Sequence, residues 1–166
     1  NDELLRRIKK SKSKFIVMHT NSPGSPFTII LSEIFKLSES DINECAIFTG
    51  SFSKAWKQGK KKTVVDIFYS TQLYKSESMN IGTWGVKGKI SHKSVNLILV
   101  LTKQKGILRA IPQQSVKNKN SIISTLIPGK IDKSHFLPKL QIETEEHLNQ
   151  DELLSALPAG GVQILR

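Results

Sequence analysis

The stretch that decides the fold runs from Phe15 to Trp56 and reads FIVMHTNSPGSPFTIILSEIFKLSESDINECAIFTGSFSKAW. Two apolar runs, at 15–19 and 27–31, flank a segment at 21–26 that is made of Asn, Ser, Pro and Gly. Apolar runs on both sides of such turn residues are typical of a β-hairpin with a longer loop. The stretch therefore predicts two antiparallel strands at the start of the fold.

A helix is predicted directly after this hairpin. Ser38 is the best N-cap candidate in the chain, because Asp41 stands three residues later in the capping-box pattern. The apolar spacing predicts one helix over 39–57 that ends at Gly59. Gly50 in its middle costs roughly 1 kcal/mol relative to Ala, and a close approach of the helix to a sheet would explain it.

The remaining pattern places this chain in the α+β class. We expect an antiparallel sheet with one main helix packed on a face, plus a C-terminal extension. The expected division is a domain over 1–106 and an extension over 107–166 that packs on the same domain. The other predicted elements are helices at 1–10 and 148–157, strands at 63–69, 95–101, 107–111 and 162–165, and a turn at 124–129.

Composition excludes several classes of protein. The longest apolar run, at 97–101, is far shorter than the ~20 residues that a membrane span requires. The charged N-terminus shows no signal peptide, and its first residue, Asn, indicates a trimmed or excised segment. Cys45 is the single cysteine, so we expect no disulfide framework, no zinc site and no cofactor. A reducing, cytoplasmic location is the expectation that follows.

The charge is large and uneven. The formal net charge is +11; residues 140–166 are net acidic, and the rest of the chain carries all of the excess lysine and arginine. Such an excess points to nucleic acid, the ribosome or another anionic surface as a partner. The alternative is a lysine-rich surface that is merely solvated.

Candidate contacts with nucleic acid combine bases, an aromatic ring and loop groups. His19 and Ser25 belong to the hairpin and its loop, and Trp84 lies among lysines in a Gly-punctuated segment, an arrangement that suits stacking plus phosphate contact. The lysines in the predicted interface are Lys12, Lys14, Lys54, Lys57, Lys60, Lys61, Lys62, Lys87, Lys89 and Lys93.

Two other functions stay open at this point. A small hydrolase would need His19, Ser25 and Asp66 to form a triad, although a lone His on an apolar face is more often a partner of backbone groups. A protein-interaction module would use the acidic segment Glu143–Glu152, which would dock a partner or cover the basic face of its own chain.

Three segments in the right order resemble the RNA-binding domain of the NFACT proteins, known as NFACT-R. They are MHTNSPGSPFTII at 18–30, the helix end at 52–56, and VVDIFYSTQLYKSESMNIGTWGVKGK at 64–89. The resemblance covers about residues 14–105. The chain departs from the family pattern at Pro26, where many members carry His, and it keeps only Lys75 of a Val-Lys-Lys motif. The resemblance implies a non-catalytic module that binds tRNA or ribosomal RNA in ribosome quality control.

Overall fold

The computed structural model describes residues 2–144 and 148–165, and the predicted α+β class is confirmed. Eight of the ten strands in the described residues are divided between two four-stranded antiparallel sheets. In spatial order, the first sheet holds β2 (Thr28–Ile30), β1 (Ile16–Thr20), β3 (Lys62–Tyr69) and β6 (Ser91–Asn96). The second holds β10 (Gly161–Ile164), β9 (Ile122–Asp132), β7 (Leu99–Gln104) and β8 (Ile107–Ile111).

Short elements complete the fold. A two-stranded ladder pairs β4 (Leu73–Tyr74) with β5 (Gly85–Val86) beside the first sheet. The helices are α1 (Asp2–Lys10), α2 (Glu39–Ser51), α3 (Lys54–Lys57), α4 (Phe136–Thr144) and α5 (Gln150–Ala156). None of the helices in the described ranges has both the length and the apolar character that a membrane crossing needs.

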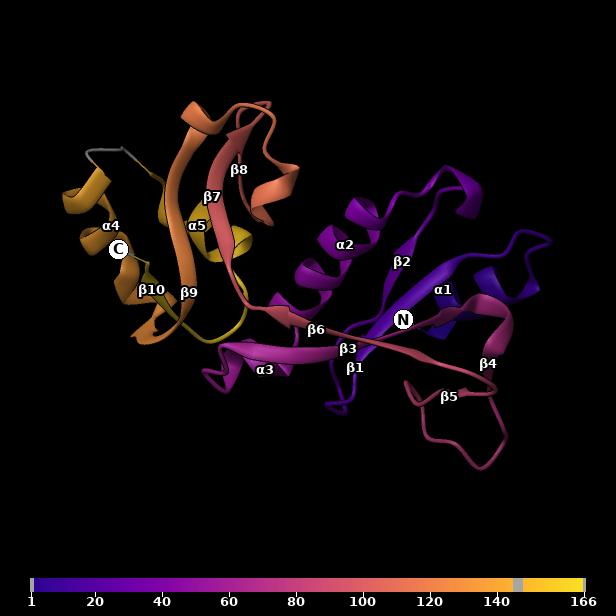
Figure 1. Cartoon of the computed structure of the whole chain (residues 1–166). Helices are drawn as coiled ribbons and strands as arrows, with labels where there is room; N and C mark the ends of the chain where they lie inside the picture. Colours follow the sequence, from indigo (N-terminus) through magenta and orange to yellow (C-terminus); the bar gives the residue numbers. More distant parts are fainter. Residues whose placement is uncertain (1, 145–147, 166) are drawn as a thin grey trace.

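The first sheet is covered on both faces. Because side chains alternate along a strand, Met18 of β1 lies on the face that α2 covers, where it joins Val65 in the main core. Val17 points to the opposite face, where it packs with Leu5 of α1 and with Phe68. Figure 1 shows α2 between the two sheets and α1 at the far side of the first sheet.

One continuous core joins the two sheets. It contains Met18 and Val95 of the first sheet, Leu101 and Leu126 of the second, and the fully buried Trp56 of α3. The indole Nε1 of this tryptophan donates a hydrogen bond to the carbonyl oxygen of Gly161 at 3.0 Å. The loop and helix that precede β3 are therefore fixed to the last strand of the second sheet.

The predicted helix over 39–57 is wrong in its length. The capping box of Ser38 and Asp41 forms as predicted, but α2 ends at Ser51, and Ser53 is the N-cap of the separate helix α3. The side chain of Ser53 also donates to the carbonyl of Gly50 at 2.7 Å, which diverts the chain. The proposed close approach at Gly50 is confirmed, because an added Cβ would lie about 3 Å from side chains of β3, β6 and the segment after it.

Two further predictions are corrected. The predicted strand at 95–101 is two strands, because the chain leaves the first sheet after Asn96 and enters the second at Leu99. The predicted turn at 124–129 is part of the long strand β9, and helix α4 was not predicted. The division of the chain at residue 106 stays a prediction, although β7, which precedes that residue, pairs with β8 and β9.

Candidate nucleic-acid interface

Three titratable residues form a row across the first sheet, on the face that α1 also covers. His19 of β1 is paired with Asp66 of β3, and Asp66 is paired with His92 of β6. Carboxylate oxygen Oδ1 of Asp66 accepts a hydrogen bond from Nδ1 of His92 at 2.7 Å. The sheet register thus holds one carboxylate between two imidazoles.

A hollow of about 510 Å³ lies beside this row. The hairpin loop at 21–26 forms one side of it, and the segment Gly82–Trp84 forms the other. Its apolar lining comes from Phe27, Phe68, Val86 and Ile90, and its titratable lining comes from His19 and Asp66 alone among the described residues. No described lysine lines the hollow, so its chemistry differs from that of the basic surface around it.

His19 is held by the hairpin loop. Its Nε2 lies 3.0 Å from the carbonyl oxygen of Ser25, and since that oxygen only accepts, Nε2 carries the proton and donates it. The ring stacks on Phe27 with 4.3 Å between centroids. Burial lowers the pKa of His19, while the bond to Ser25 and the charge of Asp66 oppose this shift. The expectation that His19 is a partner of backbone groups is confirmed, and its Nδ1 remains as an acceptor in the neutral ring.

The hairpin loop is fastened to α3. Ser25 is only 6% exposed, and its hydroxyl oxygen accepts a hydrogen bond from the backbone N–H of Lys54 at 3.2 Å. Gly24 has a φ of +79°, which favours glycine, and the Lys54 side chain crosses directly over it. The loop therefore has one fixed shape, and the hydroxyl of Ser25 contributes to it.

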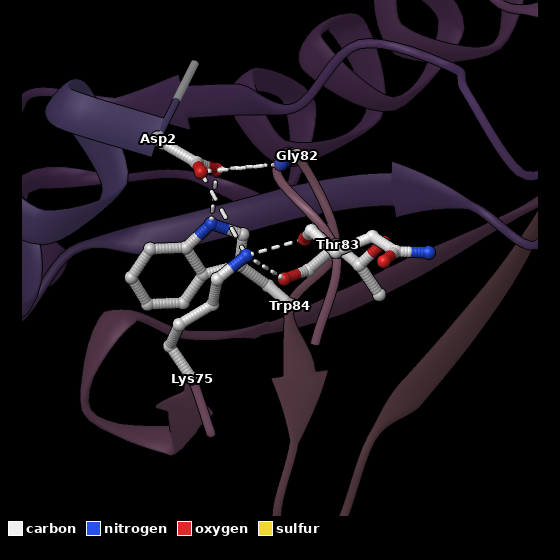
Figure 2. A network of polar contacts seen from close by, with 6 residues as sticks. Asp2, Lys75, Gly82, Thr83 and Trp84 are labelled. Atoms are coloured by element: carbon white, nitrogen blue, oxygen red, sulfur yellow. Dashed lines mark hydrogen bonds and ion pairs between the residues drawn. The ribbon is translucent and has the colours of Figure 1, made fainter. Parts of the chain in front are cut away.

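The opposite wall of the hollow is also fixed (Figure 2). Trp84 Nε1 donates to Oδ1 of Asp2 at 2.8 Å, and the backbone N–H of Gly82 donates to the same carboxylate. Lys75 Nζ donates to the carbonyl of Thr83 at 2.8 Å and lies 3.7 Å from Asp2. The hydrogen bond from Trp84, followed by that from Gly82, lowers the pKa of Asp2. Trp84 is half-buried, so it serves the structure and still lines the hollow.

The predicted lysines divide between the two ends of the first sheet. One set, which we name the α3 cluster, is exposed at the end where β3 begins; it consists of Lys54, Lys57, Lys60, Lys61 and Lys62. The other end holds Lys12, Lys14, Lys87 and Lys89. Strand β3 separates these ends by about 23 Å at ~3.3 Å per residue. Lys93 belongs to neither set, because it lies beside Val65 on the side of α2.

The residues suggested for a hydrolase do not form a triad. His19 bonds to the carbonyl oxygen of Ser25 instead of its hydroxyl, and Asp66 bonds to His92. Within residues 2–144 and 148–165 there is also no group of three side chains suited to hold a metal ion. The geometry gives the hydrolase hypothesis no support.

Sequence reasoning missed three residues of the site: Asp2, Phe27 and Lys75. Phe27 could have been predicted from the hairpin. The strand register pairs Met18 with Thr28, so the next position along places Phe27 opposite His19. Asp2 was assigned only to the N-terminal helix, and its contact with Trp84 crosses 82 positions. No local pattern signals a contact of that range.

Two comparisons with known proteins bear on the family of this chain. Residues 1–88, which contain the hairpin, the α3 cluster and Trp84, match the family described as the NFACT protein RNA binding domain. The chain is also 24% identical over 172 aligned positions to the archaeal Rqc2 homologue aRqcH of Methanocaldococcus jannaschii. That alignment covers 96% of this chain and 25% of the relative, so the chain spans about a quarter of the relative's length. The family match covers more than half of the chain, and the chain therefore belongs to the NFACT RNA-binding domain family.

Proposed function

We propose that the chain is a non-catalytic module that binds tRNA or ribosomal RNA during ribosome quality control in the cytoplasm. Membership of an RNA-binding family is the observation that carries this proposal. The similarity to an Rqc2 homologue supports the ribosomal context.

The α3 cluster supplies the main phosphate contacts in this proposal. Its five lysines are all exposed, and Lys54 crosses the loop that borders the hollow. Lysine contacts of this kind provide affinity and steering without reading the base sequence. The rigid loop and Trp84 then supply the shape that selects structured RNA. Lys12, Lys14, Lys87 and Lys89 engage a second stretch of backbone at the other end of the sheet.

Binding to labelled tRNA, ribosomal RNA fragments and duplex DNA across a salt series tests the proposal. We expect one structured RNA to bind best, with affinity that falls steeply as salt rises. Equal binding to all three would show generic charge attraction. The absence of binding at low salt would overturn the proposal.

A protein-interaction role has one observation in its favour. A second hollow of about 520 Å³ lies between α2, β8 and α5, where Phe48, Phe52 and Ile107 meet Asp151 and Glu152. Of the acidic segment proposed earlier, Glu145–His147 lie outside the described residues. Neutralising Asp151 and Glu152 tests whether this segment shields the basic face, because RNA affinity would then rise by more than the loss of two negative charges explains.

A further inference from the structure

We propose that the hollow beside Asp66 binds one unpaired nucleobase of the RNA and prefers guanine. This inference rests on the proposed function, because it names the part of the RNA that one site recognises. It adds a base-reading site to a surface whose lysines contact only phosphates.

Charge decides which part of a nucleotide enters the hollow. Its only charged side chain is the carboxylate of Asp66, and no described lysine or arginine lines it. A phosphate there would be repelled by that carboxylate, whereas Lys54, whose side chain crosses Gly24 at the edge of the hollow, attracts it. A nucleotide whose phosphates lie on the α3 cluster would therefore point its uncharged base inward.

The walls suit a flat ring. The hollow measures about 510 Å³, within the range of pockets that hold small ligands, and Phe27, Phe68 and Trp84 line it. Unstacked RNA bases commonly stack on such aromatic side chains. The loop that carries Phe27 and the segment that carries Trp84 are both fixed by hydrogen bonds, so the two walls exist before RNA arrives.

The two titratable side chains in the hollow, Asp66 and His19, offer hydrogen-bond acceptors. Oδ2 of Asp66 has no hydrogen bond from the described residues, and Oδ1 is shared only with His92. Nδ1 of His19 is an acceptor as well, because Nε2 donates to Ser25. Guanine is the one base that presents two adjacent donors, N1–H and the 2-amino group, on its pairing edge. A carboxylate complements this pair of donors, and the other three bases each place an acceptor there.

The RNA side of the test needs no variant protein. Four hairpins share one stem and differ in a single unpaired loop base, and a fifth carries inosine, which lacks the 2-amino group. Affinity is measured by anisotropy, and stacking in the hollow by quenching of tryptophan fluorescence. Trp56 is fully buried, so it supplies a constant background to Trp84. We expect the guanine loop to bind about tenfold tighter than the adenine loop, with inosine in between.

The protein side uses Asp66→Asn, with Glu77→Gln as the control for loss of one negative charge from an exposed loop. If Asp66 reads guanine, Asp66→Asn weakens the guanine loop, while the adenine loop changes only as it does in Glu77→Gln. If Asp66 only repels RNA, the same variant strengthens all loops, as Glu77→Gln does, and the inference is wrong. The adenine loop and a thermal melt report whether the variant is folded. If Asp66→Asn does not fold, the unsubstituted protein decides the question. Weaker binding of the inosine loop than of the guanine loop supports the inference, and equal affinity overturns it.

Failure of the base site can be distinguished from failure of the proposed RNA binding. Salt-dependent binding with equal affinity for all five loops would overturn the base site and leave the proposed RNA binding intact. Failure to bind any hairpin, tRNA or ribosomal fragment would overturn both.

Discussion

The indole N–H of Trp84 donates a hydrogen bond of 2.8 Å to the carboxylate of Asp2, across 82 positions of the chain. The contact joins the first turn of α1 to the segment that walls the hollow. Lys75 completes the junction by bonding to the carbonyl of Thr83 while lying near Asp2 (Figure 2). The position of α1 and the shape of the hollow are therefore coupled.

Replacing Asp2 by Asn should loosen this junction. The variant loses the charge that accepts hydrogen bonds from Trp84 and Gly82 and attracts Lys75. We expect a lower melting temperature and a red shift of the fluorescence of Trp84, because its indole gains exposure to water. Both are read from thermal melts and emission spectra.

Glu3→Gln is the matched control for that variant. Glu3 lies in the same turn, but its carboxylate is exposed and, among the described residues, pairs with Arg7 alone. Surface pairs of this kind contribute little to stability. If both variants lowered the melting temperature equally, the junction would have no special role.

His19 should make stability depend on pH between 7.5 and 5.5. Its pKa in the folded chain is lowered by burial from the ordinary 6.5, so the unfolded chain binds more protons in this window. The free energy of unfolding therefore falls as the pH drops through the window, and it should fall less in His19→Gln. Urea denaturation at several pH values measures this.

The exposed His92 provides the comparison for that experiment. His92→Gln also removes a titratable imidazole but leaves the buried one, so the fall with pH should persist. The carboxyl groups whose pKa is lowered, among them Asp41 and Asp132, titrate below the window and do not contribute. An unchanged slope in His19→Gln would contradict the assignment.

Replacing Lys60–Lys62 together by Gln should weaken RNA binding and flatten its salt dependence. Each lost phosphate contact reduces the slope of log affinity against log salt by about 0.7–0.9. The control replaces Lys105, Lys117 and Lys119, which are exposed on loops of the C-terminal half. Equal effects of the two triple variants would show that net charge, and not the α3 cluster, determines the affinity.

Gly160→Ala should destabilise the junction between α3 and the second sheet. Gly160 has a φ of +112°, and an added Cβ would lie 2.6 Å from the Cα of Lys57. A positive φ alone costs roughly 1–2 kcal/mol for Ala, so the contact should raise the total above that range. Gly59→Ala is the control, since Gly59 has a φ of +71° and nothing near its Cβ position. Equal losses in urea denaturation would show that the contact relaxes.

Local signals predicted the parts of the fold that local forces determine. The capping box at Ser38 forms as the sequence indicates, and α5 lies within the helix predicted at 148–157. Pro128 led to the wrong prediction of a turn at 124–129. It is tolerated in β9 because the pairing with β7 ends at Leu126, so the strand has one neighbour there and the missing N–H breaks no ladder. Helix α4 was not predicted, because a proline such as Pro138 normally indicates that a segment is not helical. Pro138 lies in the first turn of α4, where proline is tolerated.

The candidate site was predictable in its residue types and not in its arrangement. His19, Ser25 and Trp84 were all selected from the sequence, and the structure brings them to one hollow. The lysines were predicted to contact nucleic acid, but the sequence leaves open whether they converge on one face, because convergence depends on strand direction. Strand β3 leads away from Lys62, and so places the α3 cluster far from Lys14.

The hydrogen bond from Trp56 to Gly161 has a consequence for how the protein emerges during translation. The indole N–H is fully buried, and its acceptor belongs to β10, which the ribosome makes more than a hundred residues later. Until β10 is present, this indole N–H lacks its partner, and α3 lacks the hydrogen bond that fastens it to the second sheet. The α3 cluster, the densest group of lysines in the chain, therefore reaches its final geometry only after β10 has been made and has paired with β9.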